Sequence, residues 1–249
     1  MPTNDVATAL AAAAPDDRAT KRRFVHDMFG AIAPRYDLLN HLLSLSIDRY
    51  WRRRAIEELR WQRAPHGRYL DLCAGTLDVA LGLARRAGFA GRVIGADFAE
   101  PMLRVGRQKM SAEPVSPVVA DALQLPLAPA SAEGAIVAFG IRNVNDLDAA
   151  LREVFRVLSS GARFVILEFT TPRNTVVRAI YHSYFRHVVP LIGGLVSGHR
   201  GAYRYLPASV AQFPGEAELA ERMRAAGFRD VGWLSLTLGV AAIHVGAKP

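Results

Sequence analysis

Polar residues and a glycine turn stand where three short apolar runs end, in a pattern that could bind an adenosine. They are Asp71, Gly75, Thr76, Asp97, Asp121 and Ala122. Asp97 follows Gly75 by 22 positions, about the spacing at which a carboxylate accepts hydrogen bonds from ribose hydroxyls. Asp121 and the backbone amide of Ala122 could hold an adenine edge. We predict one adenosine site here; the alternative is that Gly75 only makes a turn and Asp97 is a solvated strand end.

The loop Cys73–Leu77 contains a single glycine, and this decides which adenosine cofactor it suits. The pyrophosphate of a dinucleotide needs close backbone approach at several glycines and a helix N-terminus for its charge. S-adenosylmethionine has no phosphate and needs one close approach. Its sulfonium is also favoured by the acidic residues Asp71 and Asp78. The predicted cofactor is therefore S-adenosylmethionine rather than NAD.

From residue 68 onward, short apolar runs alternate with helix-length segments, which is typical of a parallel sheet with right-handed crossovers. The predicted strands are Tyr69–Leu72, Arg92–Ala96, Val115–Val119, Gly134–Phe139, Ala162–Glu168, and an antiparallel pair Asp230–Leu236 and Val240–Gly246. The predicted helices are a segment from Leu77, then Pro101–Lys109, Leu147–Leu158 and Glu216–Ala226. Leu123–Ala130 is too short and proline-rich for a helix. We expect an α/β, Rossmann-like fold, in which a seven-stranded, mostly parallel sheet carries helices on both faces and binds its ligand at the carboxyl edge.

The 249 residues suit a single α/β domain spanning 18–249, preceded by an alanine-rich tail at 1–17 that we expect to be disordered. Residues 18–63 have the pattern of helices broken at Ala33-Pro34, and we interpret them as an N-terminal lid. Residues 169–215 follow the fifth strand and are interpreted as a cap that contacts the substrate.

The formal net charge of +8 is unevenly distributed. No Asp or Glu lies between Glu168 and Glu216, whereas this stretch holds five arginines and several aromatic residues. Arginines and aromatics together could bind single-stranded nucleic acid, but the run Val188–Leu195 is too apolar for that role. An apolar channel, with arginines facing anionic lipid headgroups, accounts for both features. The alternative is an ordinary packed cap with solvated arginines. We expect a small-molecule partner and no nucleic acid.

No secretory signal is apparent, and no strongly apolar run reaches the ~20 residues needed to span a bilayer. The single cysteine, Cys73, excludes an internal disulfide and agrees with a reducing compartment. His182, His187 and His199 lack the spacing of metal ligands, so no metal is expected. We expect a cytoplasmic protein, free or peripheral on the inner face of the membrane, as a monomer or a homodimer.

Four stretches resemble the ubiquinone/menaquinone-biosynthesis C-methyltransferase family, whose members are class I S-adenosylmethionine-dependent methyltransferases. They are Tyr36–Asn40 continuing through Leu43-Ser44 to Trp51; Phe139–Val144; Arg156–Leu158 with Gly161 and Leu167–Phe169; and Tyr203–Pro207 with Ser209-Val210 and Phe213-Pro214. The resemblance implies methylation of a ring carbon on a prenylated hydroquinone, such as demethylmenaquinol or a ubiquinol precursor. It also implies cofactor contacts at Thr76, Asp97 and the pair Asp121-Ala122.

Several positions depart from the family pattern. They are Leu39, Asp48, Leu77, Ala138, Ser159-Ser160, His199 and Gly201. Asp48 stands where histidine is usual, Leu77 replaces a glycine of the loop, and Ala138 replaces a serine beside the cofactor. These departures leave open another small aromatic or lipid acceptor. Further alternatives are a catalytically silent scaffold subunit that binds the cofactor, and an RNA methyltransferase.

The predicted catalytic residues are Arg142, Tyr36 and Asn143. Our hypothesis is that Arg142, after the fourth strand, faces the bound methyl group and stabilises the phenolate of the acceptor, or acts on its proton through a water. The alternative is that Arg142 only pairs with a structural carboxylate. Tyr36 would hydrogen-bond the cofactor or the substrate, or only pack between helices. Asn143 would orient Arg142, whereas Asn40 and Trp51 are expected to be a helix cap and a core anchor.

Overall fold

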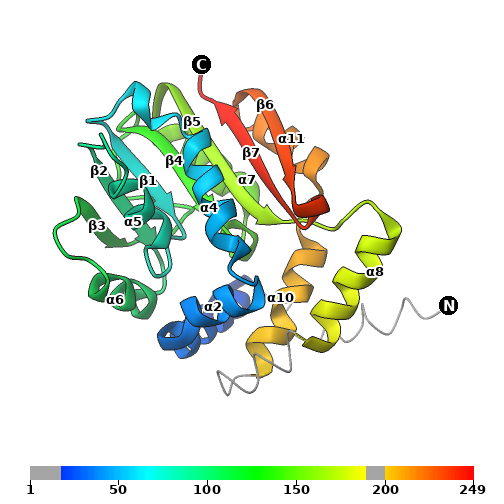
Figure 1. The fold of residues 1–249 in the computed structure, drawn as a ribbon. Helices are drawn as coiled ribbons and strands as arrows, with labels where there is room; N and C mark the ends of the chain where they lie inside the picture. Colours follow the sequence, from blue (N-terminus) through cyan, green and yellow to red (C-terminus); the bar gives the residue numbers. More distant parts are fainter. Residues whose placement is uncertain (1–17, 189–199) are drawn as a thin grey trace.

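A seven-stranded sheet forms the centre of the computed structural model, which describes residues 18–188 and 200–249 (Figure 1). In chain order the strands are β1 (Arg68–Leu72), β2 (Arg92–Asp97), β3 (Val115–Val119), β4 (Ala132–Ala138), β5 (Leu158–Phe169), β6 (Arg229–Leu236) and β7 (Ala241–Ala247). Their order across the sheet is β3-β2-β1-β4-β5-β7-β6; β1 to β5 are parallel, and β7 is antiparallel to both its neighbours. Within the described residues, the predicted strands and the closing antiparallel pair are confirmed.

Helices cover both faces of the sheet because the strands are apolar on both sides. One face carries α4 (Ile47–Glu58) and α5 (Asp78–Ala84), and the other carries α7 (Leu147–Val157) and α11 (Glu216–Ala225). Side chains of β1 alternate between these two cores: Tyr69 packs with the first, whereas Leu70 and Leu72 pack with the second. This alternation decides which side chains near the end of β1 can reach a ligand.

The structure refines the predicted boundaries around β4 and β5. β5 begins at Leu158 rather than Ala162, because Leu158 already pairs with Ala132 and α7 runs directly into the strand. Between β3 and β4 lies an isolated bridge from Asp121 to Gln124 rather than a helix. The prediction that this segment is too short for a helix is therefore confirmed.

The N-terminal helices and the cap helices gather at the edge of the sheet where the parallel strands end (Figure 1). They are α2 (Arg18–Ile32), η1 (Ala33–Arg35), α3 (Tyr36–Leu43), α8 (Thr175–Ser183), η4 (Tyr184–Val188) and α10 (Arg200–Gln212). Pro34 lies in η1, at the predicted break between two helices. Phe24 of α2 contacts Tyr205 of α10 edge to face, with ring centroids 5.6 Å apart. The N-terminal lid and the cap thus meet over the sheet edge.

Three predicted features lie outside the described residues. They are the tail 1–17, His199, and the apolar run Val188–Leu195 apart from Val188 itself. The carboxyl ends of the parallel strands are fully described, and the candidate residues meet there.

Candidate active site

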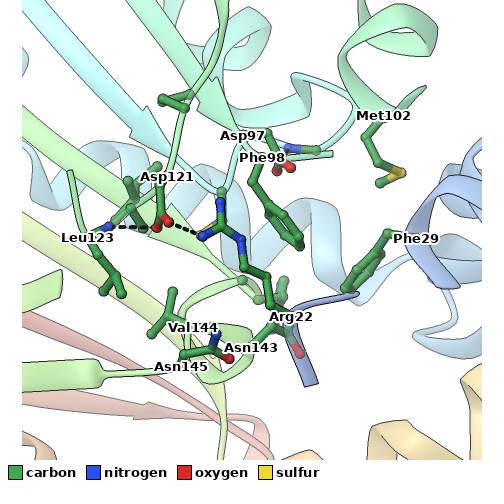
Figure 2. A pocket seen from close by; sticks show the side chains of 18 of the residues that line it. Arg22, Phe29, Asp97, Phe98, Met102, Asp121, Leu123, Asn143, Val144 and Asn145 are labelled. Atoms are coloured by element: carbon green, nitrogen blue, oxygen red, sulfur yellow. Dashed lines mark hydrogen bonds and ion pairs between the residues drawn. The ribbon is translucent and has the colours of Figure 1, made fainter. Parts of the chain in front are cut away.

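A cavity opens at the ends of β1, β2 and β4 and at the turn after β3 (Figure 2). The predicted cofactor residues that line it are Gly75, Asp97, Asp121, Ala122 and Ala138. From the N-terminal helices, Arg22, Phe29 and Tyr36 also line this first cavity. The parallel topology therefore brings together side chains that are far apart in the sequence.

Backbone amides hold the Asp97 carboxylate of the first cavity in place. Its Oδ2 accepts a hydrogen bond from the Gly75 amide at 2.8 Å, and its Oδ1 accepts one from the Ala99 amide at 2.8 Å. These bonds join the ends of β1 and β2 and fix the direction of the carboxylate. Burial raises the pKa of Asp97, and the backbone amides that bond to it oppose that rise. Because each carboxylate oxygen accepts more than one hydrogen bond, Asp97 can still accept from the hydroxyls of a ligand.

Asp121 is held from two sides (Figure 2). Its Oδ1 accepts from the Leu123 amide at 3.0 Å, and its Oδ2 pairs with Arg22 Nη1 of α2 at 2.9 Å. The Arg22 ion pair closes the lid over this end of the first cavity. Sequence reasoning missed Arg22, because nothing in the sequence separates it from the other basic residues of the N-terminal helices.

Leu77, which stands where the resemblance implies a glycine, adopts the left-handed conformation that favours glycine, with φ 65°. Its side chain is fully buried and points into the core rather than into the first cavity. Two glycines leave room for it: an added Cβ would lie 2.5 Å from Leu77 Cδ2 at Gly95, and 2.6 Å from its Cγ at Gly106. A leucine in place of glycine at position 77 therefore fills space in the core behind the loop and does not obstruct the first cavity.

Asp71 and Thr76, both predicted to contact the cofactor, lie behind the loop instead of lining the first cavity. Asp71 is buried and accepts a hydrogen bond from the Ala80 amide at 2.9 Å, and burial raises its pKa to about 7. Thr76 Oγ1 donates to Asp37 Oδ1 of the lid at 2.5 Å. Both side chains therefore hold neighbouring segments in place, and their direct contacts with a cofactor stay predictions.

Lys109 completes a clamp between the lid and the loop. Its Nζ lies 2.8 Å from Asp37 Oδ2 and 2.5 Å from Asp78 Oδ1. Asp78, which sequence reasoning assigned to the field around a sulfonium, therefore has its charge balanced by Lys109. The clamp holds the start of α3 against the start of α5.

Tyr36 occupies the position predicted for it in the lid. A Cβ added at Gly75 would lie 4.0 Å from Tyr36 Cε1, so the ring packs directly over the loop. Burial raises the pKa of Tyr36, and the hydrogen bond from Asn40 and the charges of Arg52 and Arg142 oppose that rise. Asn40 lies within α3 and bonds Tyr36, so the prediction that it caps a helix is wrong. Trp51 is buried in the first core, which confirms its prediction as an anchor.

A second, larger cavity adjoins the first. Its walls are largely apolar and come from the lid, α4 and the cap, for example Ile32, Ile180 and Leu206. The two cavities share four lining residues, which are Phe29, Tyr36, Phe139 and Asn143. The cap therefore contributes apolar walls to a space that reaches the first cavity.

Arg142 lies in η3 (Ile141–Asn143), directly after β4, and lines the second cavity. Its Nη1 donates to Glu168 Oε2 at 2.8 Å and also to the Phe139 carbonyl, and its Nε lies 3.3 Å from Ser209 Oγ. Burial acts to lower the pKa of Arg142, but the Glu168 carboxylate holds it above its ordinary value. The alternative considered for Arg142, a pair with a structural carboxylate, is thus present, and the guanidinium faces the cavity as well.

Asn143 follows Arg142 and belongs to the wall between the cavities. Its Oδ1 is buried and has no hydrogen-bond partner among the described residues. This oxygen therefore does not orient Arg142, contrary to the prediction. A buried acceptor without a donor is costly, so the wall is suited to a ligand that brings an N–H or O–H group.

Comparison with known proteins agrees with this architecture. Residues 17–248 match the ubiE/COQ5 methyltransferase family. The chain is 50% identical over 224 residues to the demethylmenaquinone methyltransferase of Thermus thermophilus, covering 89% of this chain and 100% of that relative. It is 44% identical over 228 residues to the ubiquinone/menaquinone biosynthesis C-methyltransferase UbiE of Geobacter sulfurreducens, covering 90% of this chain and 88% of that relative.

Among solved structures, a SAM-dependent methyltransferase of Thermotoga maritima, a possible histamine N-methyltransferase, is similar with a TM-score of 0.63 at 19% identity. The match covers 90% of this chain and 99% of that chain. At this identity the likeness concerns the fold alone. The predicted class I methyltransferase fold, with its mostly parallel sheet, is confirmed.

Proposed function

Because the chain belongs to the ubiE/COQ5 methyltransferase family, we propose that it transfers the methyl group of S-adenosylmethionine to a ring carbon of a prenylated hydroquinone of the demethylmenaquinol class. The sulfur–methyl bond breaks as the new carbon–carbon bond forms, and the products are the methylated quinol, S-adenosylhomocysteine and the proton that the methyl group replaces. Relatives named demethylmenaquinone methyltransferase support this acceptor. The observation that carries the proposal is the wall of Phe29, Tyr36, Phe139 and Asn143 that the two cavities share. A donor in the first cavity and an acceptor in the second would meet at this wall.

The donor set of the first cavity fits S-adenosylmethionine. Asp97 offers a fixed carboxylate for the ribose hydroxyls, and Asp121 with the Ala122 amide offers an acceptor and a donor for an adenine edge. Gly75 allows the close backbone approach that a Cβ would obstruct. The unpaired Asn143 Oδ1 supplies an acceptor for an ammonium or hydroxyl group at the shared wall.

When bound, S-adenosylmethionine supplies an electrophilic methyl group. The apolar walls of the second cavity hold the ring and the start of the prenyl tail and exclude water, which strengthens electrostatic interactions inside. Arg142, kept charged and oriented by Glu168, stabilises negative charge on a ring oxygen, which makes the adjacent ring carbon more nucleophilic. Tyr36, between the two cavities, aligns the acceptor with the donor.

The direct test is to incubate the purified protein with a labelled methyl donor and a panel of demethylated quinols under reducing conditions. We expect label in the ring of demethylmenaquinol, and little transfer after Asp97→Asn because ribose binding is weakened. A panel on which the wild-type protein transfers no label would refute the proposed acceptor class. Transfer to a different aromatic or lipid acceptor would then identify the alternative function.

We further propose that the protein docks peripherally on a membrane at the mouth of the second cavity, where a prenylated substrate would enter. Leu45 and Ile180 line this cavity and are 78% and 67% exposed, and Ile47 beside them is also exposed. Exposed Arg178 and Arg186 lie on α8 and η4 of the same cap. Apolar side chains with flanking arginines suit the interface of an anionic bilayer. None of the described helices has the length and hydropathy needed to cross one.

Vesicle sedimentation tests this docking. The wild-type protein should bind vesicles rich in phosphatidylglycerol more tightly than vesicles of phosphatidylcholine, and Leu45→Glu should weaken binding about tenfold or more. Leu234→Glu is the matched control, because Leu234 is exposed on β6 and does not line the second cavity. Equal loss of binding in both variants would contradict docking through the cavity mouth.

A further inference from the structure

A second guanidinium lies in the second cavity, on α4. Arg52 lines this cavity with a side chain that is only 14% exposed. Its Cζ lies 5.4 Å from the ring centroid of Phe139, one of the four residues of the shared wall. Arg52 therefore places positive charge close to the junction of the two cavities, in largely apolar surroundings.

One hydrogen-bond donor of Arg52 is not satisfied by the described part of the protein. Its Nε is buried and makes no hydrogen bond to any residue in the described part of the chain. The Oδ2 atom of Asp48 lies 3.4 Å from that Nε. Asp48 is meanwhile occupied by Ser44 Oγ at 2.7 Å and by His41 Nδ1 at 3.0 Å. Asp48 therefore orients the Nε side of the guanidinium, and the exposed part of Arg52, which lines the second cavity, can donate to a further oxygen.

Arg142, in contrast to Arg52, is extensively hydrogen-bonded by the protein. Glu168 accepts two hydrogen bonds from its Nη1, and the Phe139 carbonyl and Ser209 hydroxyl bond it further. Its charge is therefore largely balanced inside the protein, whereas Arg52 has one carboxylate at longer range. Of these two arginines, Arg52 has the greater capacity to bind a new anionic oxygen.

The phenol of Tyr36 shows what this charge does to an aromatic hydroxyl nearby. Burial raises the pKa of Tyr36, and Arg52 opposes this rise more strongly than Arg142 does. Tyr36 lines the same cavity as Arg52. A phenolic ligand beside Tyr36 would experience the same two effects, with the charge of Arg52 opposing the effect of burial.

We propose that Arg52 binds a ring oxygen of the acceptor in its ionised, phenolate form, and that Asp48 is the positioning residue that orients Arg52. This assignment rests on the proposed function, because it supposes a phenolic acceptor in the second cavity. A hydroquinone has two ring oxygens, so Arg52 and Arg142 can each take one. His41 and Ser44 hold the Asp48 carboxylate in place behind Arg52.

Binding of a stable phenol tests this without turnover. The probe is a naphthol with a nitro group para to its hydroxyl, which is ionised at mildly alkaline pH. Its methyl ether keeps the ring system but cannot ionise. Calorimetric titration in the presence of S-adenosylhomocysteine measures both affinities. The wild-type protein should prefer the ionised probe, and Arg52→Gln should reduce that preference about tenfold or more, as expected for a charge-assisted hydrogen bond. Arg52→Lys should recover part of it, because lysine keeps the charge but lacks the planar fork.

Arg53→Gln is the matched control, because Arg53 follows Arg52 on α4 but its side chain is exposed to solvent. It should keep the wild-type preference. A folded Arg52→Gln protein with unchanged preference would overturn the assignment. If the variants do not fold, phenylglyoxal modification of arginines in the wild-type protein replaces them. The ionised probe should protect Arg52 but not Arg53 from modification. Equal labelling of Arg52 with and without the probe overturns the proposal. Neither readout depends on methyl transfer, so a wild-type protein that fails on every quinol would refute the proposed function separately.

Discussion

Leu77 offers a sharp test of how this chain accommodates a large side chain at a glycine position of its cofactor loop. The side chain is completely buried, and its backbone is left-handed at φ 65°. Leu77→Ala should destabilise the protein by about 3 kcal/mol, through lost burial and the cavity left behind. Leu77→Gly removes still more side chain but also relieves a left-handed strain of about 1–2 kcal/mol. We therefore expect the glycine variant to be more stable than the alanine variant by about 1 kcal/mol, the reverse of their usual order within regular structure.

Gly95 supplies the second half of the test. A Cβ added there would lie 2.5 Å from Leu77 Cδ2, so Gly95→Ala alone should cost about 1–3 kcal/mol by overpacking. Once Leu77 is alanine, the other neighbour, Ala74 Cβ, is at an ordinary 3.4 Å. The new methyl group then partly fills the cavity. The double variant should be more stable than the sum of the single effects by about 2 kcal/mol.

Urea unfolding followed by tryptophan fluorescence gives the free energies of unfolding of the wild-type protein and the four variants, and calorimetry with S-adenosylhomocysteine gives the cofactor affinity. Because the Leu77 side chain points away from the first cavity, affinity should stay within about twofold for every variant that is folded at the assay temperature. Additive single effects, within about 0.5 kcal/mol, would refute the packing argument. A large loss of affinity in a folded Leu77→Gly protein would show that Leu77 shapes the cavity itself.

Three further perturbations test the site. Arg142→Ala should lower turnover about 10²-fold or more with little change in S-adenosylhomocysteine affinity, and an unaffected turnover number in steady-state kinetics would refute its catalytic role. Lys109→Ala leaves Asp37 and Asp78 without their shared cation, so the calorimetric dissociation constant for S-adenosylhomocysteine should rise about tenfold. Added salt should weaken S-adenosylhomocysteine binding by the wild-type protein more than binding by the variant. Equal salt dependence would contradict the clamp. Asp71→Asn should flatten the pH dependence of stability. Burial raises the pKa of Asp71 to about 7, so between about pH 4 and 7 the folded protein keeps a proton that the unfolded chain has lost. The free energy of unfolding of the wild-type protein should therefore fall by about 4 kcal/mol as the pH rises from about 4 to about 7. Parallel urea-unfolding curves against pH for the two proteins would refute that account.

The residues at the strand ends could be placed from the sequence because their positions follow from topology. Parallel strands end at one edge, so Asp97, Asp121 and Ala138 had to lie near one another once the strands were assigned. The same reasoning placed Arg142 after β4 and Tyr36 in the lid. Asp71 shows what strand assignment leaves open: its place in β1 was right, and only the structure shows that its side chain accepts a hydrogen bond from the Ala80 amide of α5.

Contacts between the lid, the loop and the cap could not be predicted, because they join segments whose relative position depends on the packing of whole helices. The Arg22–Asp121 pair, the Lys109 clamp and the approach of Arg52 to Phe139 are of this kind. Each pairs common residue types at unrelated spacings, so the sequence carries no local signal for them.

By itself, the sequence determined the parallel sheet, the single-glycine loop and the carboxylates at the strand ends, because strand periodicity and chain connectivity are local properties. Only the tertiary structure decided that Leu77 turns into the core, that Thr76 clamps the lid, and that an unsatisfied Arg52 faces the second cavity. The direction and partners of a side chain depend on which neighbours fill the space around it, and those neighbours come from distant parts of the chain.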